Sequence, residues 1–96
     1  MLNDTLKAYA DKYPTLTKEE VLGCNHKAYT NSSINKTDFD KCMHYACSIA
    51  VIAKAVADAH PEIDDYNRHM NATQAHNNGL KGEEAVKEVK RLFDAK

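Results

Sequence analysis

Five residues with metal-binding side chains fall at helical spacings in this sequence. Asp40, His44 and Cys47 are four and then three positions apart, so they share one face if the segment is helical. Asp65 and His69 repeat the four-residue spacing further along the chain. Zinc sites draw on these residue types, and a metal could bind between the two faces if they meet. We favour the alternative, in which each aspartate supports a histidine one turn away and Cys47 is a small buried residue, and we predict no bound metal or other cofactor.

The three cysteines favour free thiols over a disulfide framework, because their number is odd and the first residues lack the pattern of a signal peptide. Cys42 and Cys47 would be separated by about 7.5 Å of helical rise and would point apart. Only Cys24 could bridge to either of them. A metal-binding or redox-sensing helical bundle is therefore kept as an alternative function.

Catalytic patterns are weak. Cys47 and His44 could form a nucleophile and base, but no third orienting group and no oxyanion hole accompany them. The three glycines, Gly23, Gly79 and Gly82, match no phosphate-binding loop. We predict that the protein is not an enzyme.

Tyrosines with nearby cations suggest a second alternative, a small-molecule or nucleotide-binding protein. Its ligand-binding residues would be Tyr66, Arg68 and Lys54, an aromatic ring for stacking and two charges for a phosphate. We favour the plainer interpretation that the tyrosines belong to the core or its rim.

The elements that hold these residues are predicted to be helices, because glycine and proline are sparse and no segment alternates in the manner of a strand. A first short helix is indicated by apolar residues at helical spacing before Pro14: Leu2, Leu6, Tyr9 and Tyr13. Thr17 and Glu20 form a capping box that opens a second helix, from Lys18 to about Tyr29. Its apolar side comprises Val21, Leu22, Cys24 and Ala28. The Asn- and Ser-rich residues 30–36 are predicted to be a loop.

The most informative segment is a hydrophobic, Ala-rich helix over about 37–59, with Thr37 as its N-cap. Apolar residues repeat along it at three-then-four spacing, the heptad pattern of a helix that packs against another helix. We predict that this seam is a protein interface formed by Cys42, Tyr45, Ile49, Ile52 and Val56. A parallel stripe of alanines would let a neighbouring helix approach closely.

Beyond this helix, His60-Pro61 predicts a sharp corner, because proline clashes with the preceding turn but suits the first position of a new helix. The next helix is expected to run to about His76 with Ile63, Tyr66 and Met70 facing inward. Residues 77–79, Asn-Asn-Gly, predict its end. A last helix is predicted over 83–95, and its inward-facing residues are expected to be Val86, Val89, Leu92 and Phe93.

Length, composition and net charge limit the fold and the partners that the sequence predicts. Ninety-six residues and 10.8 kDa predict a single helical domain, 1–96, with an all-α fold of four to five helices bundled around the helix at 37–59. With a net charge of −1 and a pI near 6.5, the chain has no overall positive charge to attract the phosphates of a nucleic acid. No unbroken apolar run approaches the ~18 residues of a membrane span. We expect a cytoplasmic protein with neither nucleic acid nor membrane as a partner.

The apolar residues include few large side chains and many alanines, which makes a thin core. A thin core together with a heptad seam suggests that some apolar surface is covered by a second copy or another protein. The sequence therefore predicts a small non-enzymatic binding protein, a homodimer or larger oligomer, that acts by protein contact as an accessory or inhibitory factor.

Overall fold

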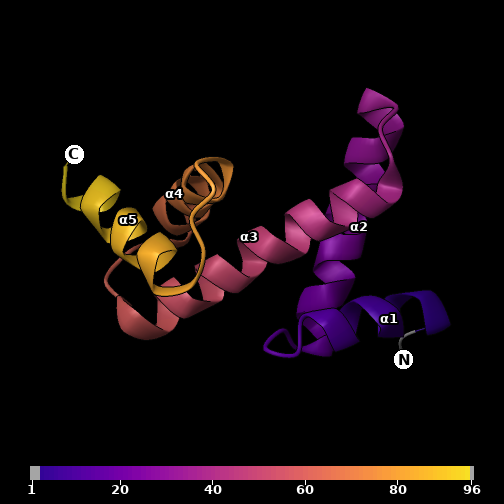
Figure 1. Cartoon of the computed structure of the whole chain (residues 1–96), viewed down its shortest axis with the longest axis horizontal. Helices are drawn as coiled ribbons and strands as arrows, with labels where there is room; N and C mark the ends of the chain where they lie inside the picture. Colours follow the sequence, from indigo (N-terminus) through magenta and orange to yellow (C-terminus); the bar gives the residue numbers. More distant parts are fainter. Residues whose placement is uncertain (1–2, 96) are drawn as a thin grey trace. The chain divides into compact units, whose positions relative to one another are not determined.

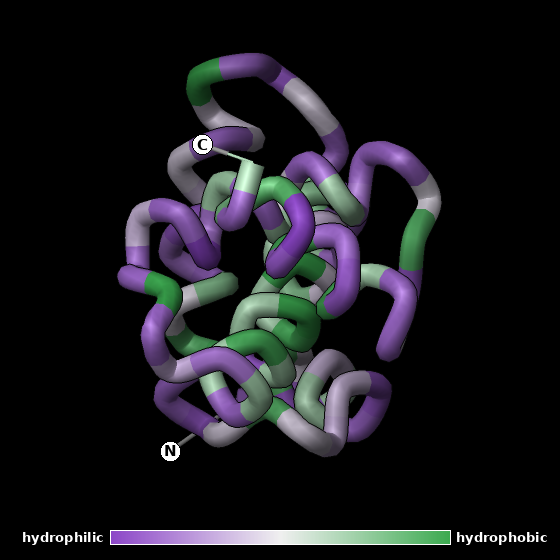
Figure 2. The backbone as a smooth tube through the Cα atoms, turned by 90° about the vertical axis from the view of Figure 1, so that its left-hand side faces the viewer, coloured by the Kyte–Doolittle hydropathy of each residue, from purple (hydrophilic) through white to green (hydrophobic). Residues whose placement is uncertain are grey.

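The computed structural model describes residues 3–95, which form five α-helices and no strand (Figure 1). In chain order they are α1 (Asp4–Lys12), α2 (Lys18–Asn35), α3 (Phe39–Ala59), α4 (Asp65–Asn77) and α5 (Gly82–Asp94). Hydrophobic residues recur between hydrophilic ones along the helices, as expected of helices that bury one side (Figure 2). The prediction of an all-α fold, a small helical bundle with a long Ala-rich helix, is confirmed. Leu2, assigned from sequence to the first helix, lies outside the described residues.

The chain divides into two compact units, and the boundary falls within α3. Unit 1 is Met1–Ser48 and contains α1, α2 and the first half of α3. Unit 2 is Ile49–Lys96 and contains the second half of α3 with α4 and α5. The prediction that 1–96 is a single domain is not tested by this division and stays a prediction.

In unit 1, side-chain caps set the helix starts. Asn3 Oδ1 accepts the N–H of Leu6 at 2.8 Å and opens α1. The capping box predicted for α2 is confirmed: the Thr17 N–H donates to Glu20 Oε1 at 2.6 Å, and the Glu20 N–H donates to Thr17 Oγ1 at 3.2 Å. α1 packs against α2. The buried apolar residues of unit 1 are Leu6, Tyr9, Leu16, Val21, Cys24, Ala28, Met43 and Cys47.

Two boundaries around α2 and α3 differ from the prediction. Residues 30–35 are helical and extend α2 to Asn35, so the predicted loop over 30–36 is wrong. The helix ends where Lys36 adopts a left-handed conformation with φ of 52°. Asp38 rather than Thr37 caps α3, because Asp38 Oδ1 accepts the N–H of Asp40 at 2.9 Å.

Unit 2 is organised around one apolar cluster, to which α3, α4, α5 and the turn before α4 all contribute. The buried residues of this cluster are Ile49, Ile52, Val56, Ile63, Ala72, Ala75, Ala85 and Val89. α4 packs against α5, and the alanines between them permit a close approach. Val86 and Phe93, predicted to face inward on the last helix, pack against the cluster while only partly buried.

The prediction for α4 was partly wrong. The corner at His60-Pro61 is present, but the helix begins only at Asp65, because Asp64 Oδ2 accepts the N–H of Asn67 at 3.2 Å and acts as the cap. Ile63 is buried as predicted. Tyr66 and Met70, predicted to face inward, are 62% and 50% exposed. The face that α4 buries consists instead of Asn71, Ala72 and Ala75.

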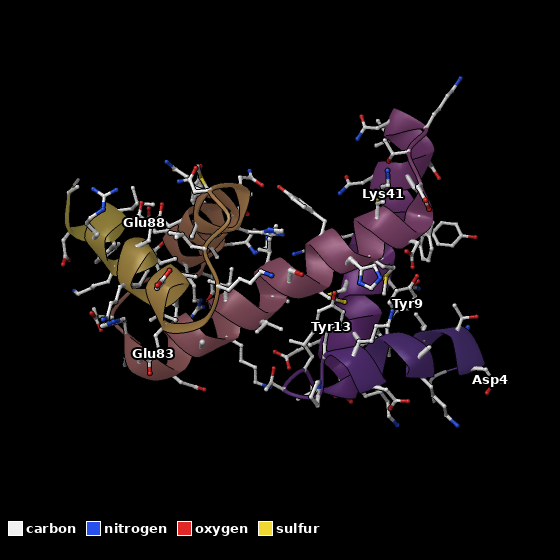
Figure 3. The ribbon with its side chains drawn as sticks, in the orientation of Figure 1. Asp4, Tyr9, Tyr13, Lys41, Glu83 and Glu88 are labelled. Atoms are coloured by element: carbon white, nitrogen blue, oxygen red, sulfur yellow. The ribbon has the colours of Figure 1, made fainter. Side chains whose placement is uncertain are left out.

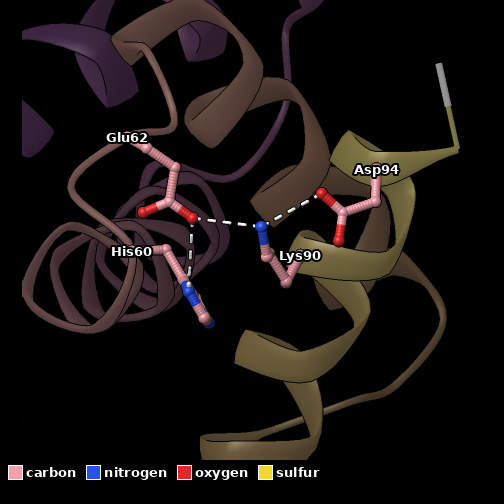
Figure 4. A network of polar contacts seen from close by, with 4 residues as sticks. All are labelled: His60, Glu62, Lys90 and Asp94. Atoms are coloured by element: carbon pink, nitrogen blue, oxygen red, sulfur yellow. Dashed lines mark hydrogen bonds and ion pairs between the residues drawn. The ribbon is translucent and has the colours of Figure 1, made fainter.

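A polar network joins the corner after α3 to α5 (Figure 4). Lys90 Nζ donates to Glu62 Oε2 at 3.1 Å and to Asp94 Oδ1 at 3.0 Å, and His60 Nδ1 lies 3.6 Å from the same Glu62 oxygen. A backbone hydrogen bond and the one from Lys90 hold the pKa of Glu62 below its usual range. Because the pKa of Glu62 is lower in the folded chain than in the unfolded chain, ionised Glu62 stabilises the fold. This stabilisation is lost as the pH falls through the lowered pKa.

α3 is the one helix within residues 3–95 that is long and apolar enough to cross a membrane by length and composition. A count of unbroken apolar residues missed this, because isolated polar residues interrupt the run. The core helix of a soluble protein passes the same test when it is mostly buried, whereas 28% of the apolar window of α3 is buried in this structure. The prediction that no membrane is involved stays a prediction.

Candidate functional site

The predicted interface on α3 is partly occupied by the chain itself. Ile49, Ile52 and Val56 are 3%, 7% and 0% exposed and lie in the apolar cluster of unit 2. Cys42 is half-buried and Tyr45 is 40% exposed. Of the predicted seam, therefore, only its N-terminal end offers side-chain surface to another molecule in this fold. Whether these five residues form an interface stays a prediction.

Within unit 1, α3 buries a pair of residues that the heptad pattern did not select. Met43 and Cys47 are four positions apart, share one face, and are both 0% exposed. This face differs from that of Cys42 and Tyr45. The first half of α3 therefore buries, within its own unit, a face other than the one that carries Cys42 and Tyr45.

The residues of the metal-binding alternative have other partners in the structure. His44 Nε2 lies 3.5 Å from Asp40 Oδ1, as the four-residue spacing predicted. Cys47 is fully buried in the core of unit 1, and Asp65 forms an ion pair with Arg68 one turn away. The part of the chain that the structure describes contains no group of three or more His, Cys, Asp or Glu side chains placed to hold a metal ion.

Two tyrosines complete a polar cluster around Asp40 and His44. The Tyr9 hydroxyl donates to Asp40 Oδ1 at 2.5 Å, and the Tyr13 hydroxyl is hydrogen-bonded to His44 Nδ1 at 2.7 Å. The His44 ring lies 5.4 Å from the Tyr9 ring, edge to face, and 5.9 Å from the Tyr13 ring. Figure 3 labels both tyrosines, which come from α1 and the residue after it and lie next to the first half of α3. The cluster ties these two elements of unit 1 together.

Sequence reasoning paired Asp40 with His44 but missed Tyr9 and Tyr13 as their partners. The available signal was the four-residue spacing of the tyrosines, which matches that of Asp40 and His44. A matched spacing indicates that two pairs can meet across two helices, but it does not identify which helices pack together.

The polar cluster leads to a prediction about alkaline pH. The hydrogen bond to Asp40, burial, and the charges of Asp40 and Asp38 raise the pKa of Tyr9 to about 12. Tyrosine in an unfolded chain titrates near pH ~10. The stabilising contribution of Tyr9 is therefore complete below about pH 10 and is lost as the pH rises toward 12.

Tyrosinate absorbance and denaturant unfolding, measured across this range, check the prediction. We expect Tyr9→Phe to remove the tyrosinate absorbance change near pH 12 and to flatten the alkaline loss of stability. Tyr66→Phe, at a tyrosine that is 62% exposed, is the matched control and should retain both the absorbance change near pH 12 and the loss of stability. An unaltered alkaline titration in Tyr9→Phe would contradict the assignment.

Two buried cysteines belong to the core of unit 1. Cys24 on α2 and Cys47 on α3 are 5% and 0% exposed. The hydrogen bond from Cys47 and the charge of Lys27 lower the pKa of Cys24, whereas donation to Cys24 and burial raise the pKa of Cys47. The third thiol, Cys42, contacts Thr37 Oγ1 at 3.2 Å. All three cysteines are free thiols in the structure.

The residues predicted to bind a ligand lie in unit 2 and are placed differently from one another. Tyr66 is 62% exposed, Lys54 is half-buried, and Arg68 is half-buried in its ion pair with Asp65. Tyr66 and Arg68 are two positions apart on α4, so they point in directions roughly 200° apart around the helix. The ligand-binding alternative stays a prediction.

The C-terminal part of α2 is the most exposed apolar element of unit 1. Beyond Ala28, its last buried residue, α2 continues through residues 29–35, which we term the distal segment of α2. Tyr29 and Ile34 in this segment are 65% and 72% exposed. The Tyr29 ring contacts the Phe39 ring edge to face at 5.6 Å. Large apolar side chains at this level of exposure, carried by a helix, are a candidate protein-binding surface.

Comparison of the chain with family models, with curated proteins and with solved structures finds no match.

Proposed function

We propose that the protein acts by protein contact, as a self-associating accessory or inhibitory factor, through the distal segment of α2. The observation that carries this proposal is the exposure of Tyr29 and Ile34, at 65% and 72%. Full burial of one such side chain contributes about 1.5–3 kcal/mol. Covering either of these side chains would therefore gain several times the thermal energy.

The distal segment also lacks the internal means to be a stable helix. It buries no residue, and Thr, Asn and Ser, which favour helices poorly, make up most of it. Helical stability in proteins comes mainly from packing of one face rather than from propensity. A second surface against the segment would supply that packing, which supports a bound state as the working form of the protein.

A second copy of the chain fits the segment by its charge. Residues 29–35 contain no Asp, Glu, Lys or Arg, so two copies can pair without like-charge repulsion. Depletion of charge and enrichment in Tyr are typical of the centre of an interface. Homodimers pair the same patch from both subunits, which requires a surface compatible with itself.

Sedimentation equilibrium tests the proposal with a matched pair of variants. Ile34→Lys introduces a charge at the more exposed of the two apolar residues of the distal segment, and we expect it to shift a dimer to monomer, weakening association by at least tenfold. Met70→Lys introduces the same charge at an apolar residue of unit 2 that is 50% exposed, and it should leave association unchanged. Circular dichroism establishes that both variants remain folded.

A wild-type protein that stays monomeric at high concentration would overturn the self-association proposal. A dimer that Ile34→Lys leaves intact would show that association uses another surface, such as Cys42 and Tyr45 at the exposed end of the predicted seam. The proposal assigns no catalytic step. A cytoplasmic location and the lack of a nucleic-acid partner stay predictions.

A further inference from the structure

We propose that Tyr9, Asp40 and His44 form a binding site for ferric iron on unit 1, with the tyrosine oxygen, an aspartate oxygen and the histidine Nε2 as ligands. The site lies on α1 and α3 and is independent of the proposed function, because it uses no residue of the distal segment of α2. It shares Asp40 and His44 with the metal-binding alternative predicted from sequence, but its third ligand is a tyrosine from another helix.

The three ligand atoms lie at separations close to those of atoms that share one metal ion. The Tyr9 hydroxyl is 2.5 Å from Asp40 Oδ1, and His44 Nε2 is 3.5 Å from the same oxygen. Neighbouring ligand atoms that each bond an ion at about 2.1 Å are about 3.0–3.4 Å apart. An ion at this place therefore requires the Tyr9 and Asp40 oxygens to separate by roughly half an ångström or slightly more. The Asp40 side chain is 62% exposed, so the core does not hold it in place.

Tyr13 holds the histidine in the orientation that such a site requires. Its hydroxyl is hydrogen-bonded at 2.7 Å to His44 Nδ1, the ring nitrogen other than the one that faces Asp40. A histidine that binds a metal through one ring nitrogen usually donates the N–H of the other to an oxygen, which fixes the tautomer. With its proton on Nδ1, His44 donates to the Tyr13 oxygen and keeps the lone pair of Nε2 for the ion. Tyr13 is therefore a positioning residue.

The ligand types select ferric iron. Phenolate and carboxylate are anionic oxygen ligands, and tyrosine also binds the haem iron of some enzymes. Imidazole suits iron, whereas Ca²⁺ and Mg²⁺ prefer sites made of oxygen alone. A phenol keeps its proton at neutral pH, so the ion must be a Lewis acid strong enough to displace it. Binding releases the Tyr9 proton to solvent and forms an Fe–O bond, and the oxidation state of the iron does not change.

The site is accessible to an ion from solvent. The side chains of Asp40 and His44 are 62% and 34% exposed, whereas Tyr9 is 9% exposed. The protein fills three positions of an octahedral ion, so water or the chelating anion that delivers the iron fills the others. Asp38, whose carboxylate accepts the Asp40 N–H at 2.9 Å, adds a negative charge beside the site.

The experiment measures the iron that the folded protein retains. The chain, purified without a His tag, is incubated with ferric nitrilotriacetate and desalted. Iron is then measured by mass spectrometry, and absorbance is measured in the visible range. We expect about one iron per chain, together with a charge-transfer band from the Tyr9 phenolate to the ferric ion.

Four variants test the assignment of the ligands. Tyr9→Phe keeps the buried ring but removes the ligand oxygen, so it should lose the band and most of the bound iron. Asp40→Asn removes an anionic ligand at a side chain that is 62% exposed and should lose the iron as well. Tyr13→Phe should keep the band and weaken binding about 10–100-fold. Tyr66→Phe, in unit 2, is the matched control and should bind iron as the wild type does. Circular dichroism establishes that each variant is folded.

The proposal is wrong if folded wild-type protein retains less than about a tenth of an equivalent of iron after desalting. It is also wrong if folded Tyr9→Phe keeps the band, or if Tyr66→Phe loses it, because the iron then binds to other tyrosines. A chain that retains zinc but no ferric iron would contradict the choice of metal. Ile34→Lys should bind iron as the wild type does, so failure of this proposal is distinguishable from failure of the proposed function.

Discussion

Replacing Met43 with alanine is expected to lower the free energy of unfolding by about 2–5 kcal/mol. Met43 is 0% exposed and is the largest of the fully buried side chains. The substitution removes its apolar contacts and leaves a cavity in unit 1, where the surrounding helices can collapse only in part. For a chain of this length the loss corresponds to a fall in Tm of about 8 °C or more.

Met70→Ala is the matched control, because it makes the same chemical change at a side chain that is 50% exposed. We expect it to change the free energy of unfolding by less than about 0.5 kcal/mol. Urea unfolding followed by circular dichroism measures both variants. An equal effect of the two substitutions would contradict the assignment of Met43 to the core.

The same unfolding curves test the prediction of a single domain. If residues 1–96 unfold as one domain, Met43→Ala shifts one transition that includes both units. Two transitions, of which only one moves, would instead show that the units unfold separately. The single-domain prediction is then wrong even though all five helices are present.

Features that depend on local chemistry were predictable from the sequence. The capping box at Thr17 and Glu20 acts within three residues, and the corner at Pro61 follows from the missing donor and the ring of one residue. The stop after α4 requires a residue that tolerates positive φ, and Gly79 adopts a φ of 80°. These signals fixed most helix boundaries to within a few residues.

Features that depend on which surfaces meet were not predictable in the same way. The distal segment of α2 has the composition of a loop, yet it continues the helix that the capping box begins. Tyr66 and Met70 have the spacing of a buried face, but α4 buries its small residues against α5. Local periodicity does not distinguish these faces, because both repeat at helical spacing.

In the candidate site, too, contacts within one helix were predictable from the sequence and contacts between helices were not. Asp40 and His44 could be paired from sequence because they lie on one helix. The hydrogen bond from Tyr9 to Asp40 joins two helices, so it follows only from the packing of unit 1.

In unit 2 the corresponding large effect is expected at Ile63, where alanine should lower the free energy of unfolding by about 2–5 kcal/mol. Ile63 is 1% exposed although it lies in the turn between α3 and α4 rather than in a helix. Its N–H donates to the carbonyl of His60 at 3.1 Å, and its side chain enters the apolar cluster. The residue therefore fixes the corner to the core, and its truncation affects both the cluster and the path of the chain into α4.

Two further variants test whether the loss of stability in Ile63→Ala comes from a cavity in the core rather than from the substitution of isoleucine by alanine as such. Ile63→Val removes one methylene and should cost only about 0.5–1.5 kcal/mol. Ile34→Ala makes the full change at a side chain that is 72% exposed, and in dilute monomer it should cost less than about 0.5 kcal/mol. Urea unfolding should therefore rank the three variants in the order Ile63→Ala, Ile63→Val and Ile34→Ala. If Ile63→Ala proves as mild as Ile34→Ala, the turn is not held by the cluster, and α4 must be fixed in unit 2 by its contacts with α5 and by the network of Glu62 and Lys90.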